Sequence, residues 1–252
     1  MRTAIQTLSA SLAAALSGAF VAALLAPAAS WAGERVTGSG RSATEARSVG
    51  AFEAIRLEGS IDLTVRQGDA ASVSATADDN LLPHLETVVE GGAASPRLVV
   101  RWKPGSNIST RGSVRVDVVT PRLSALASAG SGGLRVEAFS TPSLALSLAG
   151  SGDASLDGLK TEALQIAVAG SGDVKAEGRA QRLKVSVAGS GDVRAQALHA
   201  DDVSVSVAGS GDVAVHALKV LSVKIAGSGD VLYTGNAVVN SSIVGSGTVR
   251  HR

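Results

Sequence analysis

Five aspartates in the second half of the chain each follow a Gly-Ser-Gly triplet, and their types and spacing could do chemistry. They are Asp153, Asp173, Asp192, Asp212 and Asp230. Stacked in a column about 4.8 Å apart, such carboxylates would repel one another by roughly 1 kcal/mol in water and could recruit Ca²⁺. They could instead hydrogen-bond to backbone amides of a turn. The sequence favours turn chemistry, with a cation column as the alternative, because the nonapeptide repeat of tight Ca²⁺ sites is absent.

A glycine-rich loop can also hold a phosphate, but this loop has the wrong context. A nucleotide loop opens a helix directly after a strand and often carries a Lys. Here Gly-Ser-Gly-Asp is followed by a strand-like Val-x-Ala pattern, and its carboxylate would repel a phosphate. We therefore expect no cofactor.

The Gly-Ser-Gly triplet recurs at intervals of 18 to 20 residues, which identifies an internal repeat. Its first glycines are Gly130, Gly150, Gly170, Gly189, Gly209, Gly227 and Gly245. Sharp structural corners are expected at Gly150 and Gly152, Gly170 and Gly172, Gly189 and Gly191, Gly209 and Gly211, and Gly227 and Gly229. Near-identical sequence segments at a fixed period favour stacked coils over a meander of hairpins, because stacking places equivalent residues above one another.

Within each repeat, apolar and polar residues alternate with a period of two, which predicts a strand with one buried face. In the copy that begins at Val168, this parity places Gly170, Gly172 and Val174 inward and Asp173 outward. The sequence thus predicts an all-β protein, a parallel β-helix of about 18–20 residues per rung. Differences in rung length should be absorbed at the corner opposite the glycines, where residues 177–182, 197–202 and 217–220 differ.

Residues 33–252 are expected to form one domain, in which 124–252 carry the regular rungs and 33–123 an irregular beginning. The irregular part contains a degenerate Gly-Ser-x-Asp ending at Asp62 and a stretch around 80–87 that could be helical. We interpret it as a diverged start of the same stack that carries an insertion and caps its open edge.

Residues 1–32 have the pattern of a signal peptide: Arg2, an apolar run and a Ser-Trp-Ala end. A retained membrane anchor is the alternative; after cleavage no transmembrane segment would remain. The predicted location is the periplasm or the extracellular surface. The net charge of +1 argues against a nucleic-acid partner, and the absence of cysteine excludes disulfides and thiolate sites.

Few residues suggest catalysis. The histidines His84, His199, His216 and His251 lack ligand spacing, and the aromatic residues Phe52, Trp102, Phe139 and Tyr233 are too scattered for a sugar platform. We therefore expect no enzyme, with a polysaccharide-active β-helix enzyme as the alternative. An interaction face is the other candidate, formed by an outward strip of Ser186, Ser204, Ser206, Ser222 and Ser242 with Lys184 and Lys224.

An ordered set of motifs resembles one bacterial family. The set contains "GSGR" at 38–41, "RSVGAFEAIRLEGSIDLTVRQG" from Arg47, "ADDNLLPHLETVVEGG" from Ala77, "VRVDVVTPRLSALASAGSG" from Val114, and the tandem "AGSGD" copies. These residues resemble the GIN-domain family of adhesin head domains, over essentially the whole mature chain. The resemblance implies a right-handed, single-stranded β-helix, a secreted or envelope location and an adhesive role. It leaves three roles open: a non-catalytic envelope protein that binds a cell-surface protein or glycan, the enzyme, or a scaffold that self-associates through open ends.

Overall fold

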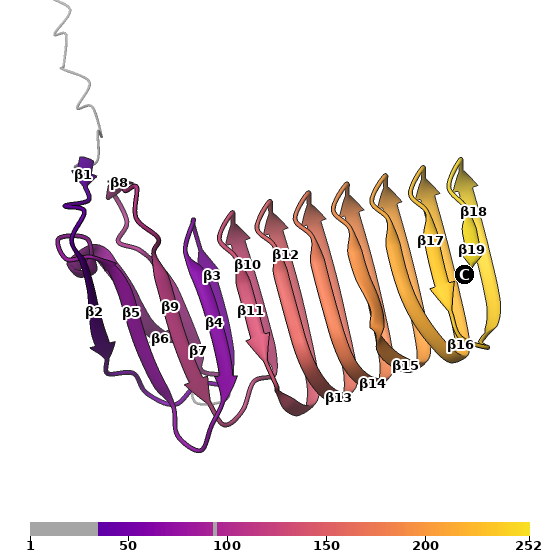
Figure 1. Ribbon diagram of the computed structural model, residues 1–252, viewed down its shortest axis with the longest axis horizontal. Coiled ribbons are helices and arrows are strands. Elements are labelled where there is room, and N and C mark those ends of the chain that lie inside the picture. The colour runs from indigo at the N-terminus through magenta and orange to yellow at the C-terminus, as the bar shows by residue number, and fades with distance from the viewer. Residues whose placement is uncertain (1–34, 93–94) are drawn as a thin grey trace, which may run out of the picture. The chain divides into compact units, whose positions relative to one another are not determined.

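The computed structural model describes residues 35–92 and 95–252, so the expected signal peptide lies outside the described residues. These residues form a stack of mostly parallel strands (Figure 1). The regular rungs are β12 (Ser140–Gly150), β13 (Ala154–Gly170), β14 (Val174–Gly189), β15 (Val193–Gly209) and β16 (Val213–Gly227). The C-terminal end has β17 (Val231–Thr234), β18 (Val238–Gly245) and β19 (Val249–His251). The predicted parallel β-helix is confirmed.

The stack begins with shorter elements. Beside the regular rungs lie β3 (Ala54–Glu58), β4 (Asp62–Gln67), β10 (Ala125–Gly130) and β11 (Leu134–Glu137). The remaining elements are β1 (Arg35–Thr37), β2 (Ser42–Arg47), β5 (Ser72–Asp78), the 3-10 turn η1 (Leu82–His84), β6 (Leu85–Glu90), β7 (Arg97–Trp102), β8 (Asn107–Ser109) and β9 (Arg115–Thr120).

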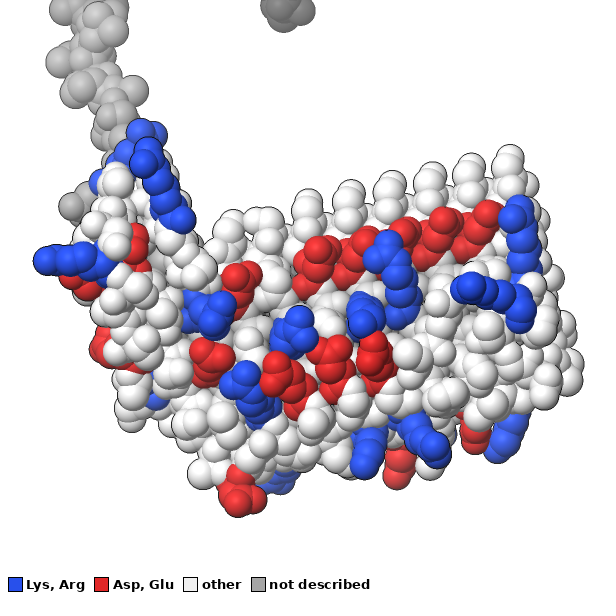
Figure 2. Space-filling model, in the orientation of Figure 1, with Lys and Arg blue, Asp and Glu red and all other residues white. Residues whose placement is uncertain are grey.

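Each rung contributes to two faces. After a glycine corner the chain runs along one face, as in β4, β11 and β17, and after the opposite corner it returns along the other, as in β3, β10 and β18. The long strands β13 to β16 bend at that opposite corner and belong to both faces (Figure 1). The face that contains β4, β9 and β11 carries rows of acidic residues with Lys and Arg between them (Figure 2), and we call it the charged face. The other face, which contains β3, β10 and β12, is called the small-residue face.

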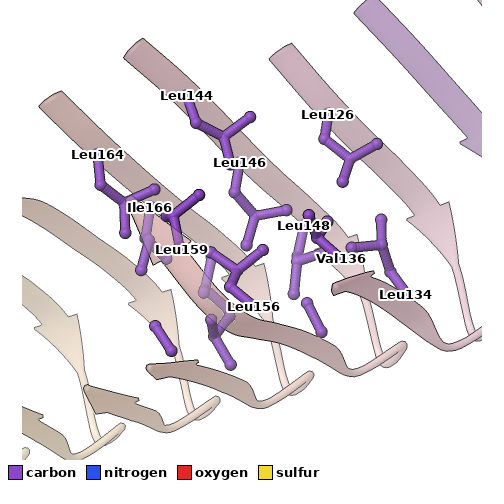
Figure 3. Close-up of a cluster of buried hydrophobic side chains, with 14 of the residues drawn as sticks. Leu126, Leu134, Val136, Leu144, Leu146, Leu148, Leu156, Leu159, Leu164 and Ile166 are labelled. Atoms are coloured by element: carbon purple, nitrogen blue, oxygen red, sulfur yellow. The ribbon is translucent and has the colours of Figure 1, made fainter. Parts of the chain in front are cut away.

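The core lies between the two faces and consists of stacked aliphatic ladders. Leu144, Leu164 and Leu183 occupy equivalent positions in successive rungs, and each is at most 2% exposed. Figure 3 shows how such leucines and valines from adjacent strands point into the same interior. Since alternate residues along each strand are buried in this way, the predicted parity of the strands is confirmed.

Differences in rung length are absorbed away from the glycine corner. Gly170, Gly189 and Gly209 pair directly from rung to rung. Register shifts occur instead near the opposite corner, between Lys175 and Glu177 in β14 and between Ala195 and His199 in β15. This distribution confirms the expectation that the opposite corner absorbs the drift in repeat length.

The N-terminal part is a cap built from an insertion. Strand β3 pairs with β10 on one side and with β7 on the other, so the rung of β7 and β9 lies outside the rung of β3 and β4. Beyond it, β5 pairs antiparallel to β9 and β2 pairs antiparallel to β5. Antiparallel strands end the parallel stack, which agrees with the predicted capping role.

The stretch expected to be helical is mostly a strand. Only Leu82–His84 form a 3-10 turn, which has a proline near its start, and β6 follows at Leu85. The run Thr87-Val88-Val89 is β-branched and pairs with β7, so strand propensity and pairing override the short helical signal. The helical expectation for 80–87 was therefore wrong beyond one turn.

Ser128 interrupts an apolar ladder, and we expect Ser128→Val to stabilise the protein. Its side chain is 4% exposed, its hydroxyl has no hydrogen-bond partner among the described residues, and it stacks between Leu57 and Leu148. Replacing an unsatisfied buried hydroxyl by the two methyl groups of valine should raise the free energy of unfolding by about 1 kcal/mol. Denaturant unfolding measures this gain. Ser147→Val, on the exposed side of β12, is the control, and an equal gain there would contradict the explanation.

Candidate binding surfaces

The glycine corner depends on two different kinds of glycine. The first glycine of each triplet has a positive φ, which is +133° at Gly189, and an added Cβ would overlap the carbonyl oxygen of Gly170 one rung away. Amides of Ser190 and Gly191 donate to the same carbonyl oxygen, at 2.9 and 3.1 Å. The parity argument placed both glycines inward, but only the second, such as Gly191, is buried. The first position must be glycine because its backbone has a positive φ and because the adjacent rung lies too close for a Cβ. An inward orientation of the residue is not the reason.

The five aspartates stack at this corner as expected, and each accepts a backbone hydrogen bond from the next rung. Their Oδ1 atoms accept from the amides of Asp173, Asp192, Asp212, Asp230 and Thr248, at 2.8 to 3.0 Å. The column thus joins one rung to the next by side chain to backbone bonds. This geometry matches the turn-chemistry interpretation.

Asp62 extends the column, which the sequence analysis did not foresee. Its Oδ1 accepts from the amide of Gly133 at 2.9 Å, and Ser60 and Ser131 hydrogen-bond through their hydroxyls. The degenerate Gly-Ser-x-Asp was a visible signal. However, only the pairing of β4 with β11 shows that Asp62 belongs with the others.

One oxygen of each carboxylate in the column is bound to a backbone donor, and the second oxygens of Asp173 and Asp192 form ion pairs with Arg194. The pKa of Asp230 lies below its usual range because the hydroxyl and the amide of Thr248 donate to it. Within residues 35–92 and 95–252, no group of three or more His, Asp or Glu side chains is placed to hold a metal ion. A cation column therefore finds no prepared coordination sphere in the described residues.

Asp212 allows a clean test of the column, because none of the described residues forms an ion pair with it. Asp212→Ala should lower the free energy of unfolding by about 1–2 kcal/mol, since the amide of Asp230 loses its acceptor. Asp212→Asn keeps an acceptor oxygen and should stay near wild type. Thermal unfolding with and without Ca²⁺ measures both effects. A Ca²⁺-dependent rise in the melting temperature that Asp212→Asn abolishes would instead support the cation column.

The charged face has a groove of about 680 Å³ over β4, β9, β11 and the first residues of β13 to β15. Arg66 lies 2.7 Å from Glu137 and 3.8 Å from Asp117, and Arg135 lies 2.7 Å from Asp157. Figure 2 shows these alternating charges along the face. The groove's carboxylates are therefore largely occupied by guanidinium groups, which does not favour acid–base catalysis. The sequence analysis did not single out these residues, because their pairing depends on register.

The small-residue face contains the predicted serine strip. Lys184, Ser204 and Ser222 occupy one row, and Ser186, Ser206, Lys224 and Ser242 occupy the next. Beside them runs a column of exposed alanines, namely Ala129, Ala149, Ala169, Ala188, Ala208 and Ala226. The face therefore offers long rows of short side chains at the rung spacing.

An apolar groove of about 750 Å³ follows the edge of the small-residue face near the opposite corner. Its lining comes from successive rungs and consists of Ser124, Ser143, Leu144, Ala145, Ala163, Leu164, Gln165, Arg182, Leu183, Lys184, Asp202, Val203, Ser204, Val220 and Ser222. The four rungs of β12 to β15 each contribute one core residue flanked by two outward residues, and the two end rungs contribute Ser124 and the pair Val220 and Ser222. The groove is consequently long, apolar in its floor, and charged only in its middle.

Two of the four histidines meet at the opposite corner. The rings of His199 and His216 lie 4.5 Å apart at 85°, and His216 hydrogen-bonds with Thr234 at 2.8 Å. Their separation in sequence shows no ligand spacing, but the register of β15 and β16 pairs them. Burial and the neighbouring His199 lower the pKa of His216.

This pair makes stability depend on pH. Because the folded protein protonates His216 less readily than the unfolded chain does, stability should fall as the pH drops below about 6.5. Thermal unfolding measured between about pH 8 and about pH 5 should show a smaller decline for His216→Gln than for wild type. Identical pH profiles would contradict this role of His216.

The comparisons with known proteins agree with the fold. No curated protein matches the chain. A Bacteroides fragilis structure, described as a putative adhesin, aligns with a TM-score of 0.80 at 21% identity, covering 86% of this chain and all of that one. Two Parabacteroides distasonis structures cover 87% of this chain and are fully covered themselves. One, a "putative lipid binding protein", has a TM-score of 0.72 at 26% identity; the other, a "putative adhesin", has 0.71 at 25%.

In the described part of the chain, no helix has the length and apolarity needed to span a membrane. The family model described as "Putative auto-transporter adhesin, head GIN domain" matches residues 51–237, which include most of the cap and the regular rungs β12 to β16 with their glycine corners. The chain belongs to this GIN-domain family, as its ordered motifs indicated.

Proposed function

We propose that the protein is a non-catalytic, adhesin-like binding protein of the cell envelope, located in the periplasm or at the cell surface. The observation that carries this proposal is the small-residue face, with its rows of alanine and serine repeated from rung to rung. Family membership and the two relatives described as a putative adhesin and a putative lipid binding protein support it.

The small-residue face suits binding through many weak contacts. Alanine loses no side-chain rotamer freedom on binding and serine loses little, so each contact has a low entropic cost. The stack is held by ladders of backbone hydrogen bonds and by the Asp column, so the rows keep their spacing. An extended partner of repeating chemistry, such as a surface glycan or the strand edge of a surface protein, could contact several rungs at once.

The test compares charge inserted on the two faces. Ala188→Glu with Ala208→Glu places two carboxylates in the alanine column, and Ala214→Glu is the control on the charged face. The protein, fluorescently labelled, is incubated with whole bacterial cells and with a panel of bacterial surface glycans. Binding should be lost in the double variant and kept in the control. Equal binding by both variants, or none by the wild type, would contradict the proposal.

The enzyme alternative is tested with the same preparation. Polygalacturonate and related glycans are incubated with the protein, and new reducing ends or unsaturated products are measured. We expect none, because the carboxylates of the charged groove are paired with arginines. Turnover that Glu137→Gln abolishes would replace the binding proposal by an enzymatic one.

Self-association is a second candidate, favoured by the C-terminal end of the stack. Val238 and Val244 on β18 are 68% and 73% exposed, and they continue the exposed rows of Val220 and Ala226 into the last rung. Light scattering after size-exclusion chromatography measures the oligomeric state. A dimer that Val238→Lys with Val244→Lys dissociates would support this role, and a monomer at all concentrations would contradict it.

A further inference from the structure

The apolar groove at the edge of the small-residue face has a polarity along its length. Toward the N-terminal cap its lining is uncharged, with Leu164, Leu144 and Ala145 over two rungs and Ser124 at the end. Arg182 and Lys184 belong to a single rung in the middle of the groove. On the other side of them lies Asp202, which pairs in register with Arg182. Both ends of the groove are thus uncharged, its middle is cationic, and the carboxylate of Asp202 separates the two cations from the end that Val220 and Ser222 line.

The two cations have charge available for a ligand. Neither Arg182 nor Lys184 forms an ion pair with a residue in the described part of the chain, and both side chains are exposed. With Asp202 included, the lining carries a net charge of +1. Lys184 pairs in register with Ser204, and its ammonium group forms no ion pair with Asp202 of the same adjoining rung. This charge distribution complements one anionic head group.

We infer that this groove binds a single-chain anionic amphiphile, a free fatty acid, with its carboxylate at Lys184 and Arg182 and its alkyl chain directed toward Ser124. The direction follows from Asp202, because an alkyl chain running toward Val220 would have to lie across the rung that carries this carboxylate. From the rung of Lys184 to Ser124 there are three rung spacings, about 14 Å. A saturated chain of medium length fits that distance when it lies extended.

The groove's floor explains why an alkyl chain suits it better than a sugar. The buried Leu144 and Leu164 lie under the floor, the accessible apolar lining there includes Ala145 and Ala163, and no aromatic side chain lines the groove. Each methylene covered by such a floor should tighten binding by about two- to fourfold. The inference rests on the proposed function only in treating this protein as a binding protein.

The experiment measures binding of dodecanoate, octanoate and dodecanol to the protein by calorimetry, below their aggregation concentrations. Dodecanoate should bind at least about tenfold more tightly than octanoate, because the groove covers the additional methylenes. Dodecanol should bind more weakly than dodecanoate, because it lacks the charge that Lys184 attracts. Equal affinity for dodecanoate and dodecanol would overturn the head-group assignment, and no chain-length dependence would overturn the groove.

Two pairs of variants test where on the protein dodecanoate binds. Ala145→Glu and Ala149→Glu make the same change at two exposed positions of β12, inside and outside the groove. Ala145→Glu should weaken dodecanoate binding by about tenfold or more, and Ala149→Glu should leave it unchanged. Lys184→Ala should weaken it by about threefold, whereas Lys224→Ala, on the same face but outside the groove, should not. Circular dichroism confirms that each variant is folded.

Other outcomes are decisive as well. If the protein floats with phosphatidylglycerol vesicles but does not bind dodecanoate, the surface recognises a membrane and the inference is wrong. If Ala145→Glu abolishes glycan binding instead, the groove is a sugar site and the inference is wrong. Loss of cell binding in Ala188→Glu with Ala208→Glu, at unchanged dodecanoate affinity, would separate the proposed function from this site.

Discussion

Val203→Asp should leave the protein unfolded or close to unfolding at room temperature. Val203 is 3% exposed and stacks between Leu183 and Leu221 in the adjoining rungs. A carboxylate at this position would have no charged partner in the core, and burial of an unpaired charge costs several kcal/mol. A cost of that size is comparable with the whole stability of a typical domain, about 5–15 kcal/mol. Circular dichroism and denaturant unfolding measure the loss.

Ser204→Asp is the matched control for this prediction. Ser204 is the next residue of β15 and points outward, so the same carboxylate there remains in water. The control should unfold near the wild-type midpoint. If Val203→Asp unfolds at the same midpoint as the control, then the inward and outward assignment of this strand is wrong.

Gly189→Ala should have the second largest effect, with a loss of about 3 kcal/mol or more. Two costs add up at this position. The backbone φ of +133° disfavours any residue with a Cβ, and the added methyl group would overlap the carbonyl oxygen of Gly170. Relieving the overlap would separate the two rungs and weaken the bonds that Ser190 and Gly191 donate to that oxygen. Thermal and denaturant unfolding measure the loss.

Two other glycines separate these costs. Gly105 has a φ of +82° but open space around its would-be Cβ, so Gly105→Ala should cost only about 1 kcal/mol. Gly50 has open space and no positive φ, so Gly50→Ala should be nearly neutral. A Gly189→Ala variant no less stable than Gly105→Ala would show that rung stacking does not depend on this glycine.

Much of the regular stack could be predicted because of the kind of fold it is. In a β-helix the main contacts join equivalent residues of successive repeats. The repeat period of the sequence therefore shows directly which residues contact one another. Val168, Val187 and Val207 look equivalent in the sequence and do stack. The aspartates of the glycine corner likewise stack where the repeat places them.

The cap was only partly predictable, since its neighbours are not related by the repeat. Strands β3 and β4 pair with β10 and β11 across an insertion, and the pairing of β4 with β11 brings Asp62 to the aspartate column. The segment 80–87 had a weak helical signal, which the antiparallel pairing of β6 with β7 overrode. Such long-range pairings leave no period in the sequence.

The sequence by itself determined the repeat, the parallel strands, the buried parity and the family, because each of these depends on local pattern or on ordered motifs. Only the tertiary structure decided the charged face and the apolar groove, whereas the serine strip was already visible in the sequence. The charge pairs of Arg66 and Arg135, the meeting of His199 with His216 and the apolar groove all depend on register between rungs. Register is set where the opposite corner bends and shifts, and residues there differ from one repeat to the next. The repeat period in the sequence therefore specifies how the rungs stack, whereas the irregular opposite corner sets the register on which the candidate binding surfaces depend.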